Sequence, residues 1–123
     1  MARRLFEAVG RVVVVPEPLF DAVTGLSGSG PAYFFLVAEA LMEAGVQMGL
    51  TREVSRTLVV ETMLGSARLL HETGRDPEAL RAMVTSPAGT TAAGVRALEA
   101  KAVRSAFMEA VAAATERSRS LHR

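Results

Sequence analysis

One long helical segment, residues 32–48, most constrains how this chain can fold. Apolar side chains occupy nearly every side of the predicted helix instead of a single stripe. A chain of 123 residues can hold a core, but not one large enough to surround such a helix. We therefore expect a second copy of the chain to cover part of it. The apolar residues are Tyr33, Phe34, Phe35, Leu36, Val37, Leu41, Met42, Val46 and Met48.

The rest of the chain after Glu17 also consists of helices and short connectors. Thr51 is placed to cap a helix that Thr73 and Gly74 end, and Asp76 and Pro77 begin a short one. Scarce aromatic residues and abundant alanine favour close-packed helices over a sandwich or barrel. The predicted fold class is all-α, with helices over residues 18–23, 32–48, 51–73, 76–84, 92–100 and 103–121.

A single strand is predicted near the N-terminus. Arg11 and the four valines that follow form a continuous apolar run that Pro16 ends. Such a run is typical of a strand buried on both faces in a parallel sheet, and residues 5–10 before it resemble the end of a helix. We therefore expect residues 1–16 to be the remnant of a larger α/β domain and residues 17–123 to form a separate helical domain.

Composition excludes several classes of function. The net charge of +1 gives no long-range attraction to nucleic acid or to an acidic membrane. The chain has no cysteine, and His71 and His122 lie too far apart to predict a metal site. The longest apolar run, residues 31–38, is too short to span a bilayer, and no signal peptide is visible. We expect a soluble, cytoplasmic protein.

Residues 86–91, Ser-Pro-Ala-Gly-Thr-Thr, predict an anion-binding loop. Pro87 ends the preceding helix, and Thr90 or Thr91 can cap the next one. Free backbone N–H groups at that helix N-terminus favour a carboxylate or phosphate. The alternative is a plain turn between two helices.

A second glycine-containing segment, residues 27–31, resembles a phosphate-binding loop, but the residues around its glycines do not fit one. No lysine follows the glycines, and Tyr33 stands where a dinucleotide motif needs its third glycine. We expect a structural loop, with Thr24 as the polar residue best placed to reach a site. No acid or base elsewhere has a catalytic partner at a suitable spacing.

Three stretches together resemble one family. They are DAVTGLSGSGPAY at residues 21–33, AGVQMGL at 44–50 and MVTSPAGTTAAGV at 83–95. In this order and spacing they are similar to the C-terminal helical domain of pyrroline-5-carboxylate reductase. The resemblance covers nearly the whole chain.

The resemblance implies reduction of L-1-pyrroline-5-carboxylate to L-proline with NADPH or NADH by the full-length enzyme. It implies an N-terminal Rossmann domain, of which residues 12–15 would be the last strand, and helical domains that interlock in a homodimer, which is often assembled into a decamer. It assigns Thr24 a catalytic place near the ring nitrogen. It assigns the substrate carboxylate to Ser86, Gly89, Thr90 and Thr91.

Departures from the family pattern limit what this chain is expected to do alone. Ala88 replaces a usual glycine, which restricts the backbone if that position needs a positive φ. A usually glycine-rich hinge is here Ala100, Lys101 and Ala102. No dinucleotide fingerprint precedes Val12, so we expect no cofactor bound to this chain and no turnover by it alone.

Two other interpretations were open from the sequence. One is a non-enzymatic helical dimerisation module in which the Ser/Thr loop is only a turn. The other is the tail of a hydroxyacid dehydrogenase, but those enzymes use a lysine borne on a helix, and Lys101 lies at a helix junction.

Overall fold

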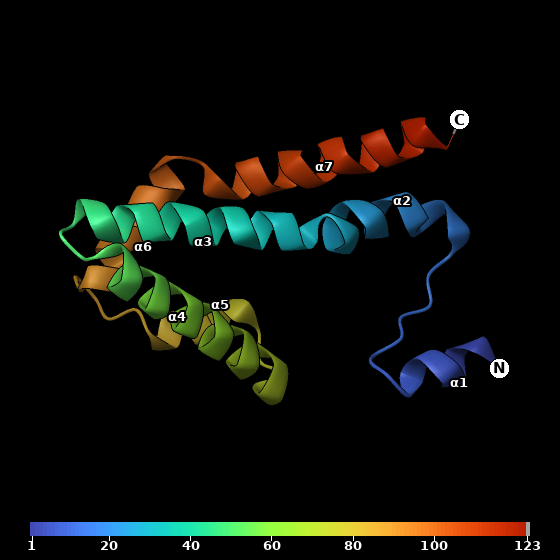
Figure 1. Cartoon of the computed structure of the whole chain (residues 1–123), viewed down its shortest axis with the longest axis horizontal. Helices are drawn as coiled ribbons and strands as arrows, with labels where there is room; N and C mark the ends of the chain where they lie inside the picture. Colours follow the sequence, from blue (N-terminus) through green and yellow to red (C-terminus); the bar gives the residue numbers. More distant parts are fainter. Residues whose placement is uncertain (123) are drawn as a thin grey trace.

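The computed structural model describes residues 1–122, which form helices joined by short connections (Figure 1). These residues contain no β-strand, which confirms the all-α class. Helix α7 runs along α2 and η2, and α4 folds back along α3. The elements are α1 (Ala2–Glu7), a 3-10 helix η1 (Glu17–Leu19), α2 (Phe20–Val23), a π-helical turn η2 (Thr24–Gly28), α3 (Gly30–Gln47), α4 (Arg52–Thr73), α5 (Pro77–Met83), α6 (Thr90–Ala100) and α7 (Val103–Leu121).

The predicted strand near the N-terminus is wrong for this structure. Residues 11–16 form no regular secondary structure, and Val13 and Val14 are 81% and 73% exposed. A strand requires a neighbour for its hydrogen-bond ladder, and nothing in residues 1–122 supplies one. The apolar run is therefore extended without being part of a sheet.

The hairpin of α3 and α4 closes at a crossing of small residues. Gly45 of α3 faces Ser55 of α4 so closely that an added Cβ would collide with the Ser55 hydroxyl. Ser55 is 1% exposed, and its hydroxyl donates to the Met42 carbonyl at 2.8 Å. As predicted, Thr51 caps α4, accepting from the Val54 N–H at 3.2 Å, and Gly74 ends it with a φ of 62°. The two backbones can approach this closely only because both residues at the crossing are small.

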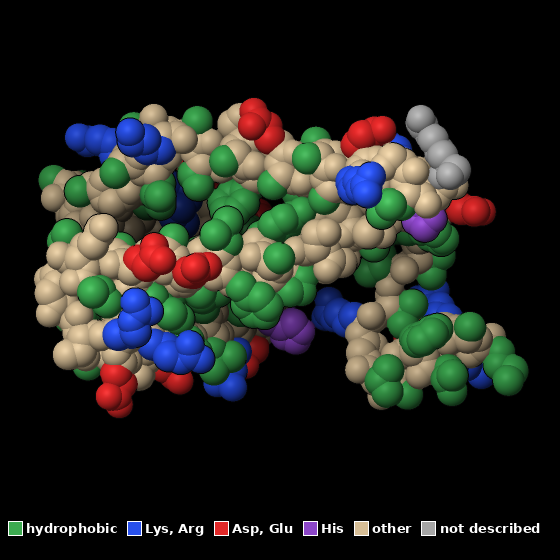
Figure 2. Space-filling view, turned by 45° about the horizontal axis from the view of Figure 1, so that its top comes forward, with side chains coloured by type: hydrophobic (Ala, Val, Ile, Leu, Met, Phe, Trp, Pro, Cys, Tyr) green, Lys and Arg blue, Asp and Glu red, His purple; other side chains and the backbone are tan. Residues whose placement is uncertain are grey.

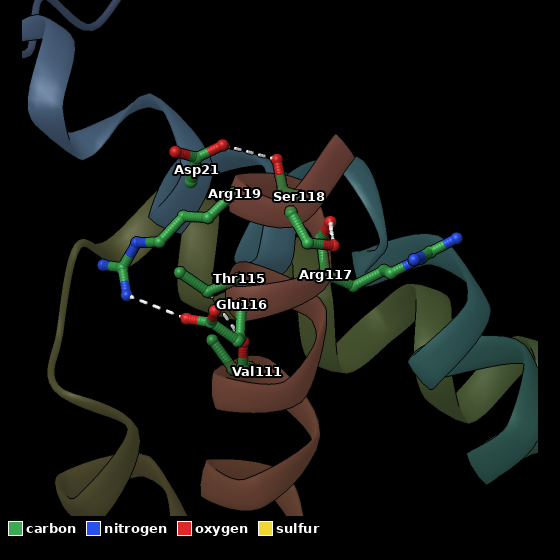
Figure 3. Close-up of polar contacts among 8 residues, drawn as sticks. Asp21, Val111, Thr115, Glu116, Arg117, Ser118 and Arg119 are labelled. Atoms are coloured by element: carbon green, nitrogen blue, oxygen red, sulfur yellow. Dashed lines mark hydrogen bonds and ion pairs between the residues drawn. The ribbon is translucent and has the colours of Figure 1, made fainter. Parts of the chain in front are cut away.

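The C-terminal half of α7 packs against α2 and η2 (Figure 3). Ser118 is buried, and its hydroxyl donates to the Asp21 carboxylate at 2.6 Å across 97 residues of sequence. One helical turn earlier, Thr115 lies against Gly25. A hydrogen bond to an ionised group is stronger than one between neutral groups, so this pair helps to fix α2 on α7.

One protomer buries very little apolar surface. Leu80, which is 8% exposed, is the single buried hydrophobic residue among the described residues. The surface area is 10287 Å², whereas a compact monomer of this mass exposes about 6,300 Å². Hydrophobic side chains lie in the open along the helices (Figure 2), and a groove of about 790 Å³ runs between α3 and α4. Its apolar lining includes Phe34, Val37, Leu41, Leu58, Leu64 and Leu70.

Two alanines adopt the left-handed backbone region that favours glycine. Ala88, in the connection between α5 and α6, has a φ of 58°, and Ala102, between α6 and α7, has a φ of 56°. Ala88 and the hinge at residues 100–102 are the positions where the resemblance leads one to expect glycine. The expectation that alanine would restrict the loop therefore applies, because the position does need a positive φ.

Candidate functional site

Thr24 begins a π-helical turn, which the sequence did not predict. The helix predicted over residues 18–23 ends with α2 at Val23, but the helical path continues through η2 to Gly28, and α3 begins at Gly30. The turn is defined by the Ser29 N–H, which donates to the Thr24 carbonyl at 2.9 Å over five residues. The predicted loop at residues 27–31 is thus mostly helical. Single π-turns are uncommon and occur often at functional sites.

The Thr24 side chain is exposed, and its hydroxyl hydrogen is already used in a hydrogen bond within the chain. The hydroxyl donates to the Phe20 carbonyl one turn earlier at 3.0 Å. The oxygen still has lone pairs that can accept a hydrogen bond from a ligand. Thr24 is therefore oriented as an acceptor.

Gly25 is fixed from two sides by residues distant from it in the sequence. Its carbonyl accepts a hydrogen bond from the Tyr33 hydroxyl at 2.9 Å. On the other side, an added Cβ would collide with the Thr115 hydroxyl and lie 3.0 Å from the Val111 carbonyl. The sequence predicted no hydrogen-bonding role for Tyr33, which was expected among the apolar residues of the long helix. The available signal was that a half-buried tyrosine hydroxyl needs a partner.

Residues 86–89 form a tight turn before α6. The Gly89 N–H donates to the Ser86 carbonyl at 3.1 Å, with Pro87 second and Ala88 at positive φ third, as in a type II turn. An added Cβ on Gly89 would collide with the Ser86 hydroxyl. The Ser86 side chain therefore lies over Gly89, and the turn aims both residues at the start of α6.

The start of α6 offers backbone donors, as predicted, but its capping differs. Gly89 is the N-cap with no side-chain hydrogen bond, so the expectation that Thr90 or Thr91 caps the helix is wrong. Within residues 1–122, the N–H groups of Thr90, Thr91 and Ala92 donate no hydrogen bond. Thr91 is half-buried and Thr90 is exposed. These donors, at the positive end of an 11-residue helix, can hold an anion.

One protomer does not bring the two groups of candidate residues together. The turn η2 packs against α2, α3 and α7, whereas α6 contacts α7 near its other end. In Figure 1, α2 and α6 are separated along most of the length of α3, which at 18 residues is about 27 Å long. Thr24 and the loop at residues 86–91 therefore lie far apart in one chain and do not form a single site there.

Other kinds of site find no support in the part of the chain that the structure describes. No group of three His, Asp or Glu side chains in residues 1–122 is arranged to hold a metal ion. None of the helices there is long and apolar enough to cross a membrane. A Rossmann dinucleotide site needs a strand, a glycine-rich turn and a helix. Since these residues contain no strand, they do not form such a site.

Comparison of sequences identifies relatives along nearly the whole chain. The profile of the family described as "Pyrroline-5-carboxylate reductase dimerisation" matches residues 17–121. Pyrroline-5-carboxylate reductase of Methanosarcina acetivorans is 52% identical over 98% of this chain and 44% of that protein. The enzyme of Thermus thermophilus is 51% identical over 98% of this chain and 45% of that protein. The chain spans less than half the length of these relatives.

Solved structures share the fold. A pyrroline-5-carboxylate reductase of Coxiella burnetii superposes with a TM-score of 0.93 at 44% identity, over 98% of this chain and 45% of that chain. The pyrroline carboxylate reductase of Plasmodium falciparum, solved with NADP bound, has a TM-score of 0.88 at 36% identity, over 97% of this chain and 48% of that chain.

Proposed function

Because the chain belongs to the pyrroline-5-carboxylate reductase family through its dimerisation domain, we propose that it binds substrate in an enzyme that reduces L-1-pyrroline-5-carboxylate to L-proline. The observation that carries this proposal is the Ser86–Gly89 turn, which leaves the first N–H groups of α6 free for a carboxylate. Thr24, oriented as an acceptor, supplies the second contact that a cyclic imino acid needs.

The substrate carboxylate binds at the start of α6. The N–H groups of Thr90 and Thr91 donate to its oxygens, and the Thr91 hydroxyl adds a third donor. Ser86 and Gly89 shape the turn that brings these donors together. A helix N-terminus favours an anion, so the loop selects the charged end of the substrate.

Thr24 holds the other end of the substrate. The protonated imine nitrogen donates its N–H to the Thr24 oxygen, whose own hydroxyl hydrogen stays hydrogen-bonded to the Phe20 carbonyl. NADPH or NADH, bound elsewhere in the whole enzyme, supplies the hydride for the imine carbon. The electron pair of the C=N bond then moves to the nitrogen, which keeps its proton throughout. Orientation therefore matters more than a strong acid or base, in agreement with the lack of a catalytic pair in the sequence.

A homodimer completes both the fold and the site. The excess surface of one protomer, about 4,000 Å² above a compact monomer, is more than the roughly 1,000–2,500 Å² that each partner of an obligate homodimer usually buries, so one protomer has surface enough for such an interface. The second copy covers the open faces of α3 and α4. It also brings its own residues 86–91 to the Thr24 of the first copy, because the two halves are too distant within one chain.

Substitution of Thr91 tests the carboxylate loop in the full-length reductase. Thr91→Ala should raise KM for pyrroline-5-carboxylate by about tenfold with a smaller change in kcat, because the hydroxyl contacts a part of the substrate that does not react. Thr73→Ala, which removes a hydroxyl bonded at the end of α4, is the matched control and should leave KM unaltered. An unchanged KM in Thr91→Ala would contradict the assigned loop.

Mixed dimers test whether the site joins two chains. Thr24→Ala and Thr91→Ala subunits are unfolded together and refolded, and activity is measured at a substrate concentration well below KM, where each variant alone has low activity. In a mixed dimer one site would carry both substitutions and the other neither, so about a quarter of wild-type activity should return. If each site lay within one chain, mixing would restore nothing.

Calorimetry of proline binding separates this proposal from a non-enzymatic dimerisation module. The dimeric domain should bind proline, and Thr91→Ala should weaken that binding.

A further inference from the structure

We infer that Tyr33 is a positioning residue for this reaction: its hydroxyl holds the π-turn η2 and thereby sets the place of Thr24. The inference rests on the proposed function, since Tyr33 acts on the substrate only through Thr24. The hydrogen bond of the Tyr33 hydroxyl goes to Gly25, which is not itself one of the assigned site residues. The role of Tyr33 follows from three contacts around Gly25, the residue next to Thr24.

The first contact is the hydrogen bond from the Tyr33 hydroxyl to the Gly25 carbonyl, 2.9 Å long. Tyr33 is the only tyrosine of the chain, lies in the first turn of α3 and is half-buried. The neighbouring Phe34 and Phe35, which lie on other faces of the helix, are 66% and 70% exposed. The hydroxyl gives this side chain a defined partner on η2.

The second and third contacts come from α7, on the opposite side of Gly25. An added atom on Gly25 would collide with the Thr115 hydroxyl and lie 2.9 Å from the Thr115 backbone nitrogen. Thr115 is held in turn, because its hydroxyl donates to the Val111 carbonyl at 2.7 Å (Figure 3). Gly25 is therefore fixed between α7 and the Tyr33 hydroxyl, and it cannot shift toward either without breaking contacts.

This clamp matters because a π-turn is an uncommon backbone form that local sequence does not stabilise strongly. The Thr24 carbonyl is bonded to the Ser29 N–H within η2, so a relaxation of η2 toward an α-helix would rotate Thr24. Hydride transfer is sensitive to such shifts, since displacements of about 1 Å can lower the rate a hundredfold. Loss of the Tyr33 hydroxyl should thus reduce turnover more than substrate affinity.

A double-substitution cycle in the full-length reductase tests this inference. Tyr33→Phe removes only the hydroxyl and should lower kcat about fivefold, the effect of one neutral hydrogen bond, with KM changed less than about twofold. Thr24→Ala should lower kcat by about tenfold or more. Because Tyr33 acts through Thr24, the variant with both substitutions should be no slower than Thr24→Ala alone.

Ser55→Ala is the matched control. It also removes a hydroxyl that donates to a carbonyl of another segment, at 2.8 Å, but at the crossing of α3 and α4. Thermal unfolding is measured for both variants. If both variants lose a similar amount of stability but kcat falls only in Tyr33→Phe, the Tyr33 hydroxyl acts by positioning Thr24. Its effect on kcat is then not a consequence of weaker folding.

The outcomes are distinct. A wild-type enzyme that does not reduce pyrroline-5-carboxylate overturns the proposed function and this inference with it. An active wild type overturns the inference alone if Tyr33→Phe retains full kcat, if Ser55→Ala is equally slow, or if the effects of Tyr33→Phe and Thr24→Ala multiply.

Discussion

Ala102 connects α6 to α7 in a backbone conformation that costs stability, so replacing it with glycine should stabilise the protein. Its φ and ψ are 56° and 41°, in the left-handed helical region. The conformation is imposed by its neighbours: the Ala102 N–H donates to the Glu99 carbonyl at 3.0 Å, and its carbonyl accepts the Ala106 N–H at 3.1 Å. Both bonds would persist in the glycine variant.

The magnitude follows from two opposing terms. An L-residue in this region costs about 1–2 kcal/mol that glycine avoids. Glycine, however, loses about 0.5–1 kcal/mol more conformational entropy than alanine on folding. Ala102→Gly should therefore raise the free energy of unfolding by about 0.5–1 kcal/mol, and Ala88→Gly, at a φ of 58°, by a similar amount.

Urea titration at one fixed chain concentration is the assay, because the stability of an associating protein depends on concentration. Ala97→Gly is the control, since Ala97 is exposed within α6 and glycine there should cost about 1 kcal/mol. The two substitutions are chemically identical and differ only in backbone conformation. If Ala102→Gly and Ala97→Gly destabilise to the same extent, the reasoning from φ is refuted.

Two further substitutions test the packing of α7 on the site. Gly25→Ala should lower the free energy of unfolding by about 1–3 kcal/mol, because its Cβ would meet Thr115; Gly10→Ala, in open space, should stay within about 0.5 kcal/mol in the same titration. Ser118→Ala should cost about 1–2 kcal/mol by removing the 2.6 Å hydrogen bond to Asp21, and thermal unfolding unchanged by that substitution would show that the contact contributes nothing.

The helix boundaries that depend on local chemistry could be predicted from the sequence. Thr51 caps α4, Gly74 ends it, and Pro77 begins α5, as expected. Each of these signals acts within a few residues, so no knowledge of the tertiary structure was needed. The Ser86–Thr91 loop was located for the same reason, since proline and glycine mark a turn wherever they occur together.

The features that could not be predicted depend on contacts with residues far away in the sequence or in another part of the protein. The predicted helix over residues 18–23 ends where α2 ends, but the sequence did not predict that η2 continues through Thr24 and Gly25. The contacts around that turn come from Tyr33 and from Thr115, which is 90 positions farther along the chain than Gly25. The strand at residues 11–15 failed for a related reason: its residues favour a sheet, but a strand exists only beside a neighbour. In both cases the local preference of the residues was identified correctly, but it does not determine the structure without the tertiary contacts.

Polar and apolar residues lie in different places in this chain, and this explains why the fold and the proposed site both depend on dimerisation. Where helices of one chain cross, the contacts are made by small or polar residues, and Ser55, Thr115 and Ser118 are the buried ones. The large apolar side chains remain on the open faces. A chain built in this way gains most of its hydrophobic stabilisation only when a second copy binds. The proposed site has the same requirement, since its two halves lie apart in one protomer. Dilution below the dissociation constant of the dimer should therefore abolish substrate binding together with the compact fold, whereas a site confined to one chain would survive in any folded monomer.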